Sequence, residues 1–250
     1  MNGLASALLR GLDPVALAAD LDLDLDPWQA DVLRSEGDVL VNGARQVGKS
    51  TVSALKVLHR ALYAPGSLSL LVAPAHRQSV ETFRTVVRFY RGLGRPVNEE
   101  GLNTMALSLE NGSRVLALPG SEQTLRGYGA VSLIVIDEAA RVPDELYHSV
   151  RPMLAVSRGQ MVCISTPNGR RGWWFEAWSR GSAHWNRFTV LAEHCSRISR
   201  EFLEEQRQIM PAWMYAQEFE GAFGDSDRAA FASEDIEAMF REEVTEWAIA

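Results

Sequence analysis

The sequence predicts an α/β fold in which helices flank a mostly parallel central sheet. The first reason is the stretch 43–50, GARQVGKS, which fits the pattern GxxxxGK[ST] between an apolar strand candidate, 39–41, and an amphipathic helix candidate, 49–62. The second is the apolar run 131–136, typical of a strand buried on both faces of a parallel sheet. Further strand candidates at 68–73 and 161–164 are each followed by a helix pattern.

Composition narrows the class of protein. The chain has 250 residues, enough for one α/β domain or for a core with a small appendage. Its formal net charge of −7 argues against a protein that coats nucleic acid with its whole surface, although a local basic strip remains compatible. Cys163 and Cys195 lie far apart, which favours reduced thiols over a disulfide or zinc site. No apolar run spans a bilayer and no signal peptide is evident, so we expect an intracellular protein without membrane contact.

The stretch 43–50 has the chemistry of a phosphate loop. Gly43 and Gly48 let the backbone bend so that successive N–H groups point at phosphate oxygens, at the N-terminus of a helix. Lys49 is expected to reach the β and γ phosphates, and Ser50 to offer a hydroxyl to Mg²⁺. The sequence therefore predicts an ATP and Mg²⁺ site whose loop residues are Gly43, Ala44, Arg45, Gln46, Val47, Gly48, Lys49, Ser50 and Thr51.

The segment before the loop is predicted to be helical. Residues 4–19 show a helical pattern interrupted at Pro14, and 21–26 is expected to be a connection. Asp26 is a candidate helix cap and Pro27 a candidate first helical residue. Gln29, which follows, is either a surface glutamine or an amide that reads the adenine edge; its place just before a phosphate loop favours the second interpretation.

After the strand at 68–73, a helix is expected from about residue 77 to 92. Arg84, Arg88 and Arg91 fall on one face of it, and Arg95 continues the row if the helix persists past Gly92. Such a row is either a solvated face or a track for a phosphate backbone. Next, 105–110 and 113–118 flank an Asn-Gly pair and predict an antiparallel hairpin. The glycine-containing stretch 120–129 then carries Arg126 in a predicted loop.

Two carboxylates end the apolar run at 131–136. At the carboxyl end of a parallel strand, Asp137 can hold the Mg²⁺ shell, and Glu138 can orient and deprotonate an attacking water. The strand candidate 161–164 ends in hydroxyls at Ser165 and Thr166, which are expected at the same sheet edge. Aromatic residues between 173 and 178 are expected to pack a helix against the sheet.

The last third of the chain changes character. We expect one more strand near 188–191 and helices near 200–210 and 211–219. Acidic residues follow Gly221, and their spacing favours a solvated linker over a two-metal nuclease site.

Taken together, these motifs resemble the large terminase subunit of tailed bacteriophages, the motor that packages DNA into procapsids. The ordered set is Pro27-Trp28-Gln29, GARQVGKS, Val72-Ala73-Pro74, Arg126-Gly127, IVIDEAA at 134–140, STPNG at 165–169 and Gln217-Glu218-Phe219, and it covers nearly the whole chain. The resemblance implies an additional-strand, RecA-like P-loop ATPase core at 1–184 and a small lid subdomain at 185–250. The RNase H-like nuclease domain of large terminases has no counterpart in the sequence, so we expect no DNA cleavage by this chain.

The resemblance also implies roles for individual residues. Gln29 would recognise adenine, Glu138 would be the catalytic glutamate, and Thr166 would couple loss of the γ-phosphate to movement. Lys49 and either Arg45 or Arg126 would stabilise charge on the transferred phosphoryl group, the latter as an arginine inserted into a neighbouring subunit. The implied partners are double-stranded DNA, further copies in a ring expected to be a pentamer, the portal and the small terminase subunit. The implied location is the host cytoplasm, with transient docking on the procapsid portal.

Two other functions remain compatible with the motifs. One is a helicase of the kind with a glutamine motif and a DEAD-like acidic motif. It needs a second RecA-like domain with further arginines, and the residues after 185 are too few and too acidic to supply one. The other is an ATP-gated scaffold that no longer hydrolyses ATP. A steady-state ATPase assay with and without DNA separates the scaffold from the motor.

Overall fold

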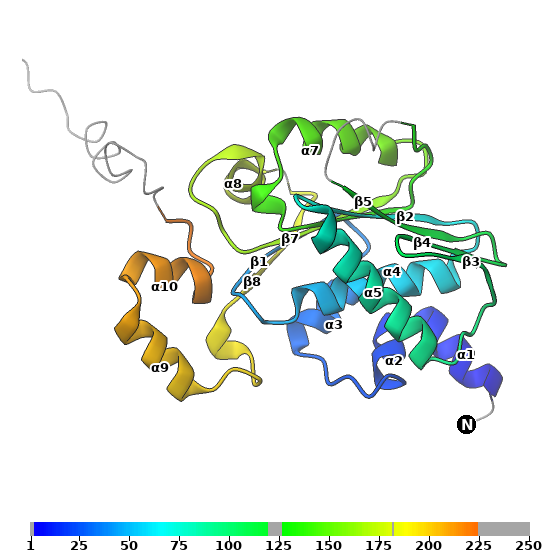
Figure 1. The fold of residues 1–250 in the computed structure, drawn as a ribbon, viewed down its shortest axis with the longest axis horizontal. Helices are drawn as coiled ribbons and strands as arrows, with labels where there is room; N and C mark the ends of the chain where they lie inside the picture. Colours follow the sequence, from blue (N-terminus) through cyan, green and yellow to red (C-terminus); the bar gives the residue numbers. More distant parts are fainter. Residues whose placement is uncertain (1–2, 120–126, 182, 225–250) are drawn as a thin grey trace, which may run out of the picture.

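The computed structural model describes residues 3–119, 127–181 and 183–224 (Figure 1). Arg126 and the residues after Gly224 therefore lie outside the described residues, as does most of the predicted loop at 120–129. None of the helices in the described ranges is both long and apolar enough to cross a membrane.

The described residues form one sheet of eight strands in the order β3-β4-β5-β2-β6-β7-β1-β8. The strands are β1 (Val39–Gly43), β2 (Leu68–Ala73), β3 (Glu99–Leu102), β4 (Ala106–Leu109), β5 (Arg114–Pro119), β6 (Leu133–Asp137), β7 (Gln160–Ser165) and β8 (Asn186–Val190). All pairs from β5 to β8 are parallel, and only β3 and β4 are antiparallel to their neighbours. A mostly parallel sheet is thus confirmed, and β7 is the additional strand between β1 and β6.

Helices cover both faces of the sheet (Figure 1). On one face lie α2 (Pro14–Ala19), α3 (Pro27–Arg34), α4 (Lys49–Tyr63) and α5 (His76–Gly92), with α1 (Gly3–Leu12) beside them; on the other lie α7 (Asp144–Val150) and α8 (Gly172–Ser179). Short 3-10 turns are η1 (Ala139–Arg141), η2 (Arg151–Leu154) and η3 (Ala192–His194). The remaining helices, α9 (Arg200–Ile209) and α10 (Ala212–Phe219), lie beyond the β8 edge.

The strands alternate between two apolar cores. Val39, Val41, Leu133, Val135, Val162 and Ile164 pack on the α4 side, whereas Leu40, Ile134, Ile136, Met161 and Cys163 pack under α7 and α8. Since successive side chains of a strand point to opposite faces, a continuous apolar run serves both cores at once. This is why these strands read as unbroken apolar runs rather than as alternating patterns.

Most predicted elements are confirmed. The interruption at Pro14 separates α1 from α2, the Asn-Gly pair joins β4 to β5, and the aromatic helix α8 packs Trp173 and Trp174 against the sheet. One strand was missed: β3, whose residues are only partly buried or exposed. The sheet also extends past residue 184, because β8 pairs in parallel with β1.

The arginine row on α5 is shorter than the sequence allowed. The helix ends at Gly92, and the chain then reverses through Gly94 and Arg95, both with positive φ (74° and 56°). Arg95 N–H bonds back to the carbonyl of Tyr90, and its guanidinium lies 3.7 Å from Glu99. Arg95 therefore does not continue the row of Arg84, Arg88 and Arg91.

Candidate active site

The carboxyl ends of β1, β6 and β7 meet the N-terminus of α4 at one edge of the sheet. Two cavities open there, of about 590 and 580 Å³. Both are lined by Ser50, Gln78, Asp137 and Glu138. The larger one also contains Arg45, Gln46, Gly48, Lys49, Thr51, Arg141, Thr166 and Arg197. The predicted phosphate loop and the two carboxylates are thus brought together, as the sequence indicated.

Gly48 makes the turn from the loop into α4 possible. Its φ of 92° lies in the left-handed region, and a Cβ there would stand 2.6 Å from Gln29 Nε2. The start of the loop is held from the edge strand: Ala44 N–H donates to the carbonyl of Val190, at 2.8 Å. Ala44 and Val47 are fully buried and anchor the loop from within.

Lys49 is the cation at the centre of the loop. Its ammonium donates to the carbonyls of Gly43 and Ala44, at 2.9 and 2.5 Å, and to Thr166 Oγ1 at 3.2 Å. Burial lowers the pKa of Lys49 to about 8, against the opposing effect of the Glu138 and Asp137 carboxylates. A desolvated ammonium near the N-terminus of a helix is suited to pairing with phosphate oxygens.

Ser50 and Asp137, the two residues that the sequence predicts as metal ligands, lie side by side. Ser50 Oγ lies 3.2 Å from Asp137 Oδ2, which also accepts a hydrogen bond from Thr82 Oγ1 on α5, at 3.1 Å. Burial, followed by the neighbouring Glu138 carboxylate, raises the pKa of Asp137. A hydroxyl beside a carboxylate is a set of hard oxygen donors, which fits Mg²⁺.

Glu138 follows in an unusual backbone conformation. Its φ and ψ of 52° and 42° are left-handed, and the turn η1 begins directly after it. Its Oε2 accepts a hydrogen bond from Arg141 Nη1 at 2.8 Å. Sequence reasoning did not single out Arg141, although its position three residues after Glu138 was a signal for such a pair.

Gln29 is buried, with 2% of its surface exposed. Its Oε1 accepts from Asp26 N–H as part of the cap of α3, and its Nε2 donates to the carbonyl of Gly48, at 3.3 Å. At the other end of α3, the buried Lys56 ammonium donates to the carbonyls of Val32, Leu33 and Ser35. Gln29 thus ties α3 to the phosphate loop.

Arg197, which no sequence pattern indicated, reaches the same loop from the segment after η3. Its Nη2 donates to Asp26 Oδ2 at 2.7 Å and to the carbonyl of Val47 at 3.0 Å. The Asp26 carboxylate raises the pKa of Arg197. The guanidinium is therefore a fixed positive charge beside the phosphate loop.

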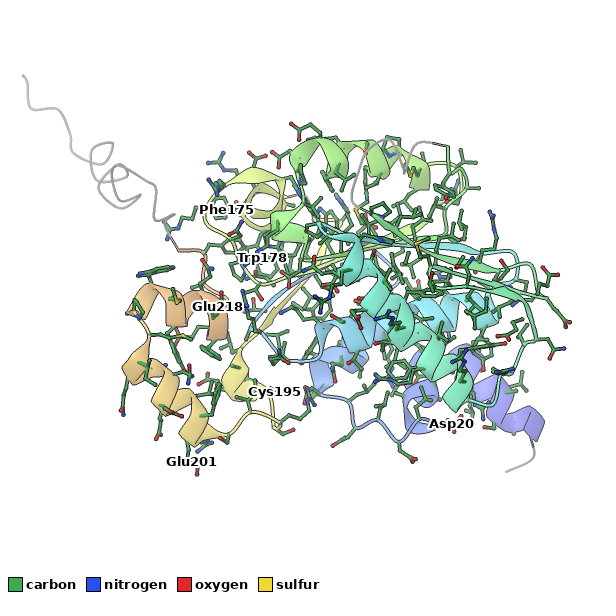
Figure 2. All side chains as sticks on the ribbon, in the orientation of Figure 1. Asp20, Phe175, Trp178, Cys195, Glu201 and Glu218 are labelled. Atoms are coloured by element: carbon green, nitrogen blue, oxygen red, sulfur yellow. The ribbon has the colours of Figure 1, made fainter. Side chains whose placement is uncertain are left out.

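The loop also contacts α10. Arg45 forms an ion pair with Glu218, and Arg45 N–H donates to the Glu218 carbonyl at 3.0 Å. Glu218 lies at the end of α10 nearest the sheet (Figure 2). Behind the loop, the buried Asn42 Nδ2 donates to the carbonyl of Gly221 at 2.7 Å. The phosphate loop is therefore bonded directly to α10 and to the segment that follows it.

The arginine row lines a different groove from the two cavities of this site. Arg84, Arg88 and Arg91 are exposed along a groove of about 620 Å³ between α5 and the end of β3, which Phe83, Val87 and Leu102 also line. Arg84 pairs with Glu81, and Arg88 lies over the ring of Phe89.

Comparison with known proteins identifies the family. Residues 40–238 match the family described as terminase large subunit, T4likevirus-type, N-terminal. The fold is similar to that of the large terminase ATPase domain of Thermus phage P74-26, with a TM-score of 0.72 and 22% identity over 82% of this chain and 96% of that one. It is also similar to a large terminase of a thermophilic bacteriophage solved with ADP, with a TM-score of 0.64 and 12% identity.

The second likeness covers 80% of this chain but only 54% of that one, so this chain spans about half of that terminase. A search of curated protein sequences found no match. The family match extends over most of the chain and includes the phosphate loop, the acidic strand end and the Ser-Thr strand end. The chain therefore belongs to the family of terminase large subunits and corresponds to their N-terminal ATPase domain.

Proposed function

We propose that this chain hydrolyses ATP with Mg²⁺ and uses the energy to move double-stranded DNA into a procapsid. The observation that carries the proposal is the meeting of Lys49, Ser50, Asp137, Glu138 and Thr166 at one sheet edge, around the N-terminus of α4. The donor arrangement and the fixed positive charges suit a nucleoside triphosphate. In a solved relative, the bound molecule is ATP-gamma-S.

Each residue has a distinct task in this mechanism. The N–H groups at the start of α4 and the Lys49 ammonium bind phosphate oxygens, and Ser50 and Asp137 hold the metal ion, which neutralises phosphate charge when bound. Glu138 takes the proton of the attacking water. Arg197 borders the part of the cavity next to Gly48, where the nucleoside is proposed to bind, and the buried Gln29 supports Gly48 through its carbonyl.

Motion would pass from the loop to the C-terminal third of the chain. Thr166 contacts the Lys49 ammonium directly, and Arg45 contacts Glu218. Loss of the γ-phosphate removes a negative charge from beside Lys49 and Arg45. We propose that the loop then shifts and that α9 and α10 move with it as a lid. The proposal includes the division of the chain into a core at 1–184 and a lid at 185–250. It also includes the expectation that this chain does not cleave DNA.

The hydrolysis step is tested with Glu138→Gln. We expect the variant to bind nucleotide like the parent but to lose at least about a hundredfold in turnover, the usual contribution of a general base. Glu145→Gln, which changes an exposed carboxylate on α7, is the control. Turnover by Glu138→Gln at the parent rate would undo the proposal.

We propose further that the active unit is a ring in which Arg126, or Arg45, stabilises the charge of the transferred group. ATPase rate should then rise more steeply than linearly with protein concentration, and Arg126→Ala should abolish the rise. Arg114→Ala, an exposed arginine on β5, is the control. Strict proportionality with no effect of Arg126→Ala would remove Arg126 from the site. The portal and the small subunit complete the proposed assembly, which would act in the host cytoplasm.

We propose that DNA contacts the groove beside α5 that is lined by Arg84, Arg88 and Arg91. Exposed guanidinium groups in a row suit phosphates and carry no sequence readout. Replacing both Arg88 and Arg91 by alanine should reduce the slope of log affinity against log salt by about 0.9 for each lost phosphate contact. Arg200→Ala, an exposed arginine at the start of α9, should leave the slope unchanged. An unaltered slope in the double variant would move the DNA contact elsewhere.

A further inference from the structure

The ion pair between Glu138 and Arg141 lies on the wall of the candidate active site. Arg141 lines the same cavity as Lys49 and Thr166. The Arg141 side chain is 33% exposed and the Glu138 side chain 30%. Arg141 Nη1 donates to Glu138 Oε2 at 2.8 Å. Ion pairs with this degree of exposure add little to stability. Their geometry, in contrast, restricts the rotamer of the carboxylate.

The bond engages one carboxylate oxygen. Arg141 donates to Oε2, so Oε1 is the oxygen left to accept a proton from water. The backbone fixes the pair as well: Arg141 N–H donates to the Glu138 carbonyl at 2.8 Å, closing a tight turn that begins at the left-handed Glu138. Glutamate and guanidinium are thus held at a spacing of three residues on one rigid turn.

This turn is bonded to the end of β7. Ala140 N–H donates to Ser165 Oγ at 3.1 Å, and the Ser165 hydroxyl in turn donates to the carbonyl of Thr166 at 2.8 Å. The Thr166 hydroxyl accepts from the Lys49 ammonium. Hydrogen bonds to the hydroxyl and to the carbonyl of Thr166 therefore connect Lys49, through the end of β7, to the turn that carries Arg141.

We propose that Arg141 is the positioning residue of Glu138, and that Ser165 fixes the turn from which it acts. This inference rests on the proposed ATP hydrolysis and deepens it. Arg141 orients Oε1 toward the water and contributes nothing to the affinity for nucleotide. Ser165 transmits the position of the β7 end to the carboxylate, so a displaced Thr166 also displaces the base.

The first test compares Arg141→Ala, Arg141→Lys and Arg34→Ala with the parent. Arg34 forms an exposed ion pair with Asp13 at 2.7 Å, away from the cavity, and is the matched control. We expect Arg141→Ala to lower kcat by about tenfold to a hundredfold, part of what a general base contributes, with KM and nucleotide affinity unchanged. Lysine should restore part of kcat, because it offers a charged donor without the planar fork.

Three outcomes separate the explanations. If the parent and Arg34→Ala do not hydrolyse ATP, both the proposed function and the inference fail. If the parent is active and Arg141→Ala keeps its kcat, the inference alone fails. If the affinity for nucleotide, measured by fluorescence titration, falls together with kcat, Arg141 binds phosphate and its role as a positioning residue is wrong.

The second test measures amide hydrogen exchange in Ser165→Ala. Loss of the Ser165 hydroxyl removes the acceptor of Ala140 N–H, so exchange at Ala140 should be faster while exchange within β7 stays that of the parent. The kcat loss of Ser165→Ala should also fail to add to that of Arg141→Ala, because both act on one carboxylate. Unchanged exchange at Ala140, or additive losses, would overturn the role of Ser165.

Discussion

Lys56 offers a quantitative test of the structure that supports the phosphate loop. Its ammonium is buried at the C-terminal end of α3, the helix that carries Gln29, and donates to three carbonyl groups. Burial, together with the nearby positive charge of Arg60, lowers the pKa of Lys56 to about 7. In the unfolded chain the same group has its ordinary pKa of about 10.4.

The sign of the pH dependence follows from these two values. Below pH 7, Lys56 is charged in both states and the folded state bears the full cost of the buried charge. Above pH 7 the folded state releases the proton first, so the unfolded state binds more protons and the free energy of unfolding rises with pH. Integrated from pH 7 to pH 9, a single proton difference of this kind contributes about 2 kcal/mol.

The assay is urea unfolding of the parent and of Lys56→Met at several pH values between 7 and 9. Methionine fills a similar volume without a charge, and other titrating groups cancel in the difference between the two proteins. We expect the parent to gain about 2 kcal/mol relative to Lys56→Met across this range. A constant difference would refute the reasoning, because it would mean that the three carbonyl acceptors keep the ammonium protonated throughout.

Three further predictions concern the loop and its support. Gly48→Ala should weaken nucleotide binding by about tenfold or more in a fluorescence titration. A left-handed backbone costs alanine about 1–2 kcal/mol, and the added Cβ would meet the side chain of Gln29. Unaltered binding would contradict the proposed role of the loop in binding phosphate. Glu218→Gln removes the ion pair with Arg45 but keeps the main-chain carbonyl that accepts the Arg45 N–H, so it should cost less than about 1 kcal/mol in urea unfolding, because the Arg45 side chain is 58% exposed; a loss of several kcal/mol would contradict this interpretation. Leu55→Ala, in a fully buried position of α4, should cost about 2–5 kcal/mol in urea unfolding, and a loss below about 1 kcal/mol would place Leu55 outside the core.

The sequence was informative wherever structure and function are encoded by neighbouring residues. The phosphate loop and the acidic strand end each combine a strand, a bend and reactive side chains within about ten positions, so their chemistry implies their geometry. The parallel sheet followed from the unbroken apolar runs of β1, β2, β6 and β7. The hairpin followed from one Asn-Gly pair.

Contacts between distant segments were not accessible in this way. Arg197 meets Asp26 across 171 positions, and nothing in the residues around either one indicates the other. The partly exposed strand β3 has a Glu-Glu-Gly-Leu sequence with neither apolar alternation nor β-branched residues. The predicted row of arginines included Arg95 on the condition that the helix continued past Gly92. The helix ends at Gly92, and charge spacing alone does not reveal the left-handed turn at Arg95.

Two hydrogen bonds from the C-terminal third hold the phosphate loop and the strand before it: Ala44 N–H bonds to the Val190 carbonyl, and Asn42 bonds to the Gly221 carbonyl. The motif alone is therefore not enough to form the loop in this shape. A fragment trimmed at residue 184 would keep all of GARQVGKS together with both acidic residues, yet it would lose both anchors of the loop. The segment from β8 to Gly221 is therefore part of what holds the phosphate loop in place, and any fragment designed around this loop should retain it.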